Sequence, residues 1–154
     1  MDVYKMYYDE SYVYFKTKQY LIDNGWTPLS GEPAGGSDEL PRVEIRDPSH
    51  KKKGSKGSLK IDLISQKEGK ILLTEAKVRF NESDLEKLNQ ITTIKMNLLI
   101  SAIKERLHID ISSKKIIKSV ALHDYETHQI PNDYVCFKVG KEVDVINSYL
   151  LLEN

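Results

Sequence analysis

Two neighbouring apolar segments constrain the fold of this chain more than any other feature of its sequence. They cover residues 59–65 and 70–80, and the polar stretch Gln66-Lys67-Glu68-Gly69 separates them. A short polar connection with a glycine between two apolar runs is typical of a β-hairpin. Because the residues around this turn are largely aliphatic, we expect the hairpin to lie in a central, buried sheet rather than at an exposed edge.

The register of this hairpin brings two acidic side chains together. If Glu68-Gly69 is a two-residue loop, Asp62 faces Glu75 across the strands, with Cβ atoms roughly 5 Å apart. Lys77 lies two residues beyond Glu75 and therefore points from the same face. Two converging carboxylates are destabilising unless a cation lies between them, and their oxygens suit Mg²⁺. The alternative is that these side chains are solvated residues of an edge hairpin.

The composition is that of one folded domain, which we place over residues 1–154. Hydrophobic residues make up 40% of the chain and charged residues 30%, a profile expected of a globular protein. No apolar run approaches the ~20 residues that span a bilayer, and no signal-peptide pattern is present, so we expect no membrane association. The single cysteine, Cys136, fits a reducing cytoplasm.

Basic residues are concentrated just before the hairpin. The formal net charge is zero, which argues against indiscriminate coating of nucleic acid. Residues 51–60 nevertheless contain no acid and several lysines, which are Lys51, Lys52, Lys53, Lys56 and Lys60. We expect these lysines to contact DNA phosphates, and strand alternation would put Lys60 on the face of Asp62. The alternative is an ordinary solvated loop.

The remaining elements are expected on both sides of the hairpin. Helical spacing predicts a helix over residues 9–23 that ends at Asn24-Gly25. The capping box Ser83-x-x-Glu86 opens a long helix to about residue 107. Strands are expected from residue 26 and over residues 42–46, 116–122 and 134–139, loops over 30–41 and 47–58, and a closing helix over 143–152. The order α-β-β-β-α-β-β-α predicts an α/β three-layer fold with a central mixed sheet.

This arrangement resembles the PD-(D/E)xK nuclease superfamily, which includes many type II restriction endonucleases and the archaeal Holliday-junction resolvases. Asp62 matches the first acid of the motif, with Ile61 in place of its proline. Glu75 and Lys77 match the second acid and the lysine. The resemblance covers the chain from about residue 9 to residue 122. It implies a restriction-endonuclease-like αβββαβ core, with a central mixed β-sheet flanked by helices.

The resemblance also implies a metal site with oxygen ligands. Asp62 and Glu75 would bind Mg²⁺ or Mn²⁺, and the backbone carbonyl of Ala76 would be a further ligand. Lys77 would orient or deprotonate the attacking water and stabilise the negative charge that develops on the phosphate. From the sequence, the pKa of Lys77 could be lowered by burial or raised by the two carboxylates.

Further positions are candidates on the same basis. Related nucleases carry an acid on the first helix, where Glu10, or its neighbour Asp9, would join the catalytic residues. Arg79 shares the face of Glu75 and could contact a DNA phosphate, or it could form a surface ion pair. Some members place a glutamine near the site on the following helix, and Gln90 could take that place or be an ordinary surface residue.

The sequence thus predicts a Mg²⁺-dependent endonuclease that hydrolyses DNA in a restriction or other defence role. Double-strand cleavage by so small a chain needs two sites, so we expect a homodimer in the cytoplasm. A Holliday-junction resolvase is the main variant, although junction binding favours a broad basic face that a neutral chain does not suggest. Two further hypotheses are a nuclease-like fold that binds DNA or protein without cutting, and an α/β domain without a nucleic-acid role. The sequence leaves open whether the substrate is DNA or RNA.

Overall fold

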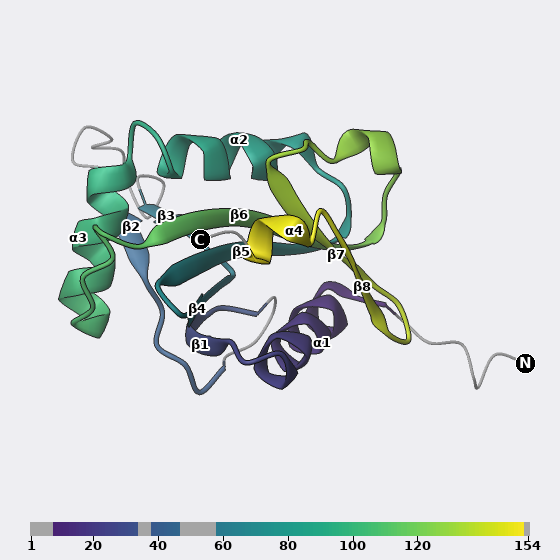
Figure 1. The fold of residues 1–154 in the computed structure, drawn as a ribbon, viewed down its shortest axis with the longest axis horizontal. Helices are drawn as coiled ribbons and strands as arrows, with labels where there is room; N and C mark the ends of the chain where they lie inside the picture. Colours follow the sequence, from purple (N-terminus) through teal and green to yellow (C-terminus); the bar gives the residue numbers. More distant parts are fainter. Residues whose placement is uncertain (1–7, 34–37, 47–57, 153–154) are drawn as a thin grey trace, which may run out of the picture.

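A six-stranded mixed β-sheet forms the centre of the computed structural model, which describes residues 8–33, 38–46 and 58–152 (Figure 1). The strand order is β1-β4-β5-β6-β7-β8; β6 is parallel to both of its neighbours, and the other pairs are antiparallel. The bounds are β1 (Thr27–Gly31), β4 (Leu63–Lys67), β5 (Lys70–Arg79), β6 (Lys115–Asp124), β7 (Tyr134–Val139) and β8 (Val143–Ile146). The expected α/β class with a central mixed sheet is confirmed.

Helices cover both faces of this sheet. α1 (Glu10–Asp23) packs on one face, and α2 (Glu82–Ile91) with α3 (Met96–Leu107) lies on the other (Figure 1). Side chains of β5 alternate between the two cores, so that Leu72 faces α1 while Leu73 faces α2 and α3. Because β5 is buried on both faces, its apolar residues Ile71, Leu72 and Leu73 are consecutive rather than alternating with polar ones.

The β4–β5 hairpin has the register that its turn predicts. Lys67 pairs with Lys70, so Glu68-Gly69 is the two-residue loop. The two loop residues have φ angles of 49° and 79°, the positive values that a type I′ turn requires at both central positions. Continued beyond the last paired residue of β4, this register sets Asp62 against Glu75.

The first strand of the expected hairpin is interrupted just before β4. Residues 58–60 form β3 (Ser58–Lys60), which pairs with β2 (Glu44–Arg46) in a separate two-stranded sheet. Ile61 and Asp62 connect β3 to β4, so strand alternation does not run from Lys60 to Asp62 as expected. Asp62 stays attached to the β1 side of the sheet, since its carbonyl accepts a hydrogen bond from Glu32 N–H at 2.8 Å.

The single long helix expected over residues 83–107 is wrong, because residues 92–95 separate α2 from α3. The Thr92 and Thr93 hydroxyls donate to backbone carbonyls one turn earlier, at 2.8 and 2.6 Å. Such bonds compete with helix continuation, and β-branched side chains lower helix propensity. The apolar stripe that suggested one helix is therefore shared between two shorter ones.

The helix ends agree with the sequence in one case and not in another. α1 ends at Asp23 with Asn24 as its C-cap, and Gly25 follows with a φ of 88°, as expected. α2, however, begins two residues earlier than the expected capping box. Its N-cap is Asn81, whose side chain accepts a hydrogen bond from Ser83 N–H at 3.0 Å. An asparagine is a strong N-cap residue, and here it takes the role expected of Ser83.

The closing helix expected over residues 143–152 is wrong in its first half. β8 pairs antiparallel with β7, and only α4 (Tyr149–Leu152) is helical. Two valines and an isoleucine make β8 rich in β-branched side chains, which favour a strand when a partner strand is present. Asn147, with a φ of 60°, follows β8 and turns the chain into α4. A short 3-10 helix, η2 (Thr127–Gln129), lies between β6 and β7.

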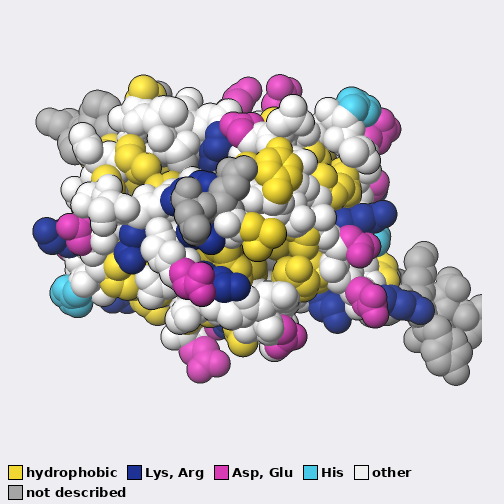
Figure 2. Space-filling view, in the orientation of Figure 1, with side chains coloured by type: hydrophobic (Ala, Val, Ile, Leu, Met, Phe, Trp, Pro, Cys, Tyr) yellow, Lys and Arg dark blue, Asp and Glu magenta, His cyan; other side chains and the backbone are white. Residues whose placement is uncertain are grey.

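Smaller differences concern boundaries and the surface. β1 runs to Gly31, into the expected loop over residues 30–41, and the loop expected over residues 47–58 lies almost wholly outside the described residues. Within the described ranges, no helix combines the length and apolar character needed to cross a membrane. On the face drawn in Figure 2, acidic and basic side chains are interspersed, and apolar side chains gather around α4.

Candidate active site

Asp62 and Glu75 hold each other in place at the point where β4 begins. Asp62 N–H donates to Glu75 Oε2 at 2.9 Å, and Ala76 N–H donates to Asp62 Oδ2 at 2.8 Å. Each carboxylate therefore accepts a backbone hydrogen bond from the segment that carries the other acid. These reciprocal bonds fix the two carboxylates side by side, which is the juxtaposition that the hairpin register predicts.

Glu75 is the more deeply buried of the two acids. Its side chain is only 2% exposed, and its Oε1 forms an ion pair with Lys87 Nζ from α2. Burial, followed by repulsion from Asp62, raises the pKa of Glu75 to about 7, although Lys87 opposes both effects. A proton and a nearby cation are thus alternative ways to neutralise this carboxylate.

Asp62 is half-buried and has one oxygen that is not engaged. Burial raises the pKa of Asp62 to about 6, although the hydrogen bond from Ala76 and the charges of Lys87 and Lys77 act in the opposite direction. Oδ2 accepts the bond from Ala76, while Oδ1 makes no hydrogen bond with any residue in the described ranges. Oδ1 is therefore the atom of the pair that an external ligand could reach.

Lys77 lies beside the pair, as the motif predicts. Its Nζ is 3.9 Å from Glu10 Oε1 on α1, and both side chains are half-exposed. Burial alone would lower the pKa of Lys77, but the surrounding carboxylates of Asp84, Glu10, Asp62 and Glu75 raise it. The sequence left open whether the pKa of Lys77 is raised or lowered, and in the structure it is raised.

α1 brings Glu10, rather than Asp9, to the site. Asp9 is the N-cap of α1, and its Oδ1 accepts a hydrogen bond from Tyr12 N–H at 2.7 Å. That bond directs the Asp9 carboxylate to the end of its own helix. Glu10, the first residue of α1, contacts Lys77 instead.

Two charged residues of α2 belong to this site although no sequence pattern singled them out. Asp84 is 7% exposed, and burial raises its pKa although the charges of Lys77 and Lys87 oppose this. Lys87 follows three residues later, so it lies on the same face of the helix. The sequence did contain a pattern that could have identified them. Asp84 and Lys87 are three residues apart in the first turns of the helix that directly follows β5, the strand that carries Glu75 and Lys77.

Other predicted residues are not gathered at the pair. Lys60 Nζ lies 3.3 Å from Glu32 Oε1 and 3.9 Å from Glu44 Oε1, so it belongs to a separate ion-pair network. Arg79 is 83% exposed, and its Nε is 3.8 Å from Asp124 Oδ2. That contact is the surface ion pair that was the alternative for Arg79.

Gln90 adds no contact to the site among the described residues, and most of the lysine run lies outside them. Gln90 is exposed near the end of α2, and its side chain makes no hydrogen bond with the described residues. Lys51, Lys52, Lys53 and Lys56 lie outside the described residues. Their expected role at DNA phosphates stays a prediction.

The donor atoms of the pair fit a hard divalent cation. Two carboxylates with raised pKa values lie side by side, and a dication would neutralise both. The Ala76 N–H points at Asp62. In a β-strand, the N–H and the carbonyl of one residue face the same neighbouring strand. The Ala76 carbonyl is therefore on the same edge of β5 as the Ala76 N–H. Lys87 would compete with a metal for Glu75 Oε1. Among the residues that the structure describes, no group of three or more His, Cys, Asp or Glu side chains is arranged to hold a metal ion.

Comparisons of the chain with protein-family models, with curated proteins and with solved structures found no match. The function is therefore inferred from the geometry and chemistry of the Asp62–Glu75 pair and of the charged residues around it.

Proposed function

We propose that this protein is a metal-dependent nuclease with a restriction-endonuclease-like core, and that it hydrolyses phosphodiester bonds in DNA. The observation that carries the proposal is the reciprocally hydrogen-bonded pair of Asp62 and Glu75. Lys77, the third residue of the motif, lies in the same group of charges. The order α1, β4–β5 hairpin, α2, β6 around this pair also agrees with the core that the resemblance implies.

Each residue of the site would have a distinct role in phosphodiester hydrolysis. Asp62, Glu75 and the Ala76 carbonyl would hold Mg²⁺ or Mn²⁺, which when bound supplies Lewis-acid activation of water and charge neutralisation at the phosphate. Lys77 would hold the attacking water or the scissile phosphate through its ammonium group. Glu10 would keep Lys77 in position through their contact.

Lys87 gives a specific reason to keep a second candidate function. Its ammonium group is paired with Glu75 Oε1, an oxygen that a metal would use. If this ion pair persists in the presence of metal, the fold would bind DNA without cutting it, and the acids would remain as charged residues of the sheet. This non-cleaving candidate and the nuclease differ in one observable, which is hydrolysis.

The experiment is cleavage of supercoiled plasmid DNA with Mg²⁺ or Mn²⁺, with EDTA as the metal-free control. We expect nicked or linear product with either metal and none with EDTA. Asp62→Asn and Lys77→Met should each lower the rate by on the order of 10²-fold or more, because each removes a group that contacts the metal or the reacting atoms. A chain that acts on both strands through one site is expected to do so as a homodimer, which its mass in solution would reveal.

Two outcomes would decide against the proposal. Equal cleavage by wild type, Asp62→Asn and Lys77→Met would show that the activity comes from elsewhere. DNA binding that survives EDTA, without cleavage under any metal, would favour the non-cleaving candidate. Unfolding curves for all variants would show that lost activity does not come from lost structure.

A further inference from the structure

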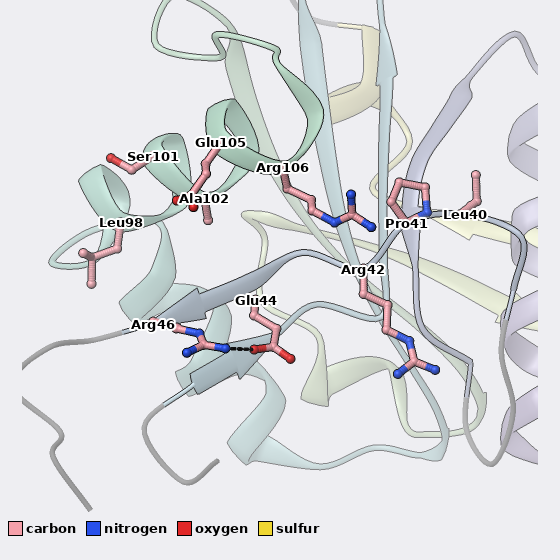
Figure 3. A pocket seen from close by; sticks show the side chains of 10 residues that line it. All are labelled: Leu40, Pro41, Arg42, Glu44, Arg46, Leu98, Ser101, Ala102, Glu105 and Arg106. Atoms are coloured by element: carbon pink, nitrogen blue, oxygen red, sulfur yellow. Dashed lines mark hydrogen bonds and ion pairs between the residues drawn. The ribbon is translucent and has the colours of Figure 1, made fainter. Parts of the chain in front are cut away.

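A groove of about 720 Å³ lies between α3 and the segment that leads into β2 (Figure 3). Three arginines line it: Arg42 and Arg46 from the β2 side, and Arg106 from the last turn of α3. In Figure 3, Arg106 extends from the helix toward Pro41 and Arg42. Arginine guanidinium groups match phosphate oxygens in geometry as well as charge, so their convergence on one groove points to a phosphate-bearing ligand.

Among the residues that the structure describes, two of these three arginines form ion pairs with acids. Arg46 pairs with Glu44 at 3.3 Å, and Arg42 lies 3.6 Å from Glu32. Arg106 has no ion pair with any residue in the described ranges, although Glu105 also lines the groove. An exposed guanidinium without a partner at the wall of a groove is the group most readily used by an external anion.

The size and the walls of the groove suit a nucleotide unit. Its volume lies within the ~300–1,000 Å³ range of small-ligand sites. Leu98 and Ala102 of α3 give one wall an apolar surface, and the Ser101 hydroxyl adds a hydrogen-bond donor. A sugar–phosphate backbone presents the same combination of an apolar sugar face and charged oxygens.

The groove is also tied to the candidate active site through the backbone. Gly31 N–H donates to the Pro41 carbonyl at 3.1 Å, at the rim of the groove. The next residue, Glu32, donates its N–H to the Asp62 carbonyl at 2.8 Å. The end of β1 is therefore hydrogen-bonded both to the segment at the rim of the groove and to the connection that carries Asp62.

We propose that this groove binds the sugar–phosphate backbone of the DNA strand that reaches Asp62 and Glu75. Arg106 and Arg42 bind phosphate oxygens, and the apolar wall formed by Leu98 and Ala102 contacts the sugar. The inference rests on the proposed nuclease function for the identity of the ligand. It adds a contact surface that no sequence motif indicated.

The test measures binding of a fluorescein-labelled 20-base-pair DNA duplex by anisotropy in EDTA, where no cleavage interferes. Arg106→Gln is compared with Lys104→Gln, which removes one positive charge from the same exposed last turn of α3 without lining the groove. Arg106→Gln should weaken binding by about tenfold, and its plot of log K against log salt should have a slope smaller by about 1. Lys104→Gln should stay within about twofold of wild type.

The outcomes separate this inference from the proposed function. Equal binding by Arg106→Gln and Lys104→Gln would overturn the proposal that the groove binds DNA, even if the protein cleaves DNA. A selective loss in Arg106→Gln would support the groove even if the wild type never cleaves, in which case only hydrolysis would be wrong. Absence of any binding of DNA by the wild type would overturn the inference.

Discussion

Replacement of Gly31 by alanine should destabilise the protein through one identifiable contact. An added β-carbon at this position would overlap the Tyr14 hydroxyl oxygen, and it would also lie 3.2 Å from Tyr14 Cζ and from Leu40 Cδ1. Tyr14 is 1% exposed, and its hydroxyl donates to Asp38 Oδ2 at 2.8 Å. The ring therefore cannot move away from the new methyl group without losing that hydrogen bond.

The two possible responses to the clash set the magnitude. Overpacking in a rigid core costs about 1–3 kcal/mol, and a lost hydrogen bond to a charged group costs about 1.5–3 kcal/mol. Because the protein adopts the less costly response, we expect Gly31→Ala to lower the free energy of unfolding by about 1–3 kcal/mol, a substantial share of the 5–15 kcal/mol that is typical of a domain. Tyr14→Phe removes the overlapping oxygen. In that background, Gly31→Ala should cost about 1 kcal/mol or less, because only the contacts at 3.2 Å remain.

Urea unfolding followed by circular dichroism measures all four members of this double-mutant cycle. Gly140→Ala is the matched control, because the nearest atom to its added β-carbon is the Glu142 carbonyl oxygen at 3.9 Å. Its free energy of unfolding should change by no more than about 1 kcal/mol. An equal cost of Gly31→Ala in the wild-type and Tyr14→Phe backgrounds would refute the reasoning.

Two further predictions concern charge and helix capping. Burial would raise the pKa of Asp38, but hydrogen bonds from Lys18 and Tyr14 hold this pKa below its ordinary value. The ionised Asp38 therefore stabilises the fold at every pH above that ordinary pKa. This contribution is lost as the pH falls through the lowered pKa. Asp38→Asn should therefore lower the urea midpoint at pH 7, and its difference from wild type should shrink toward pH 3; a difference independent of pH would be contrary to this. Asn81→Ala should lower the free energy of unfolding by about 1 kcal/mol because it removes the N-cap of α2, and Ser83→Ala should lower it by less. A larger loss in Ser83→Ala than in Asn81→Ala would instead show that Ser83 is the N-cap.

The hairpin could be predicted from sequence because its register depends on a local turn. Glu68-Gly69 adopts positive φ at both positions, and the pairing of Lys67 with Lys70 follows from the length of that loop. The position of Asp62 against Glu75 then follows by counting. The interruption at Ile61 could not be seen this way, because β3 pairs with the preceding strand β2 in a separate sheet instead of continuing into β4.

The helical partners of the site depend on tertiary context and were missed. The sequence pattern merged α2 with α3 and placed the N-cap at Ser83, although side-chain bonds of Thr92, Thr93 and Asn81 decide both ends of α2. Without the start of α2, the face that carries Asp84 and Lys87 could not be aligned with the end of β5. The helix expected in place of β8 failed for a related reason, because a free edge of β7 was needed to make that segment a strand.

The most direct measurement of the central claim is the rate of plasmid nicking in Mg²⁺ by Glu75→Gln compared with Glu68→Gln. The chain carries the acid-x-lysine pattern twice, at Glu75-Ala76-Lys77 and at Glu68-Gly69-Lys70, and only Glu75 is buried beside Asp62. Glu68 lies exposed in the hairpin turn. We predict that Glu68→Gln nicks DNA at the wild-type rate, while Glu75→Gln is slower by on the order of 10²-fold or more. Equal rates in the two folded variants would contradict the assignment of Glu75 and Asp62 as the metal-binding pair.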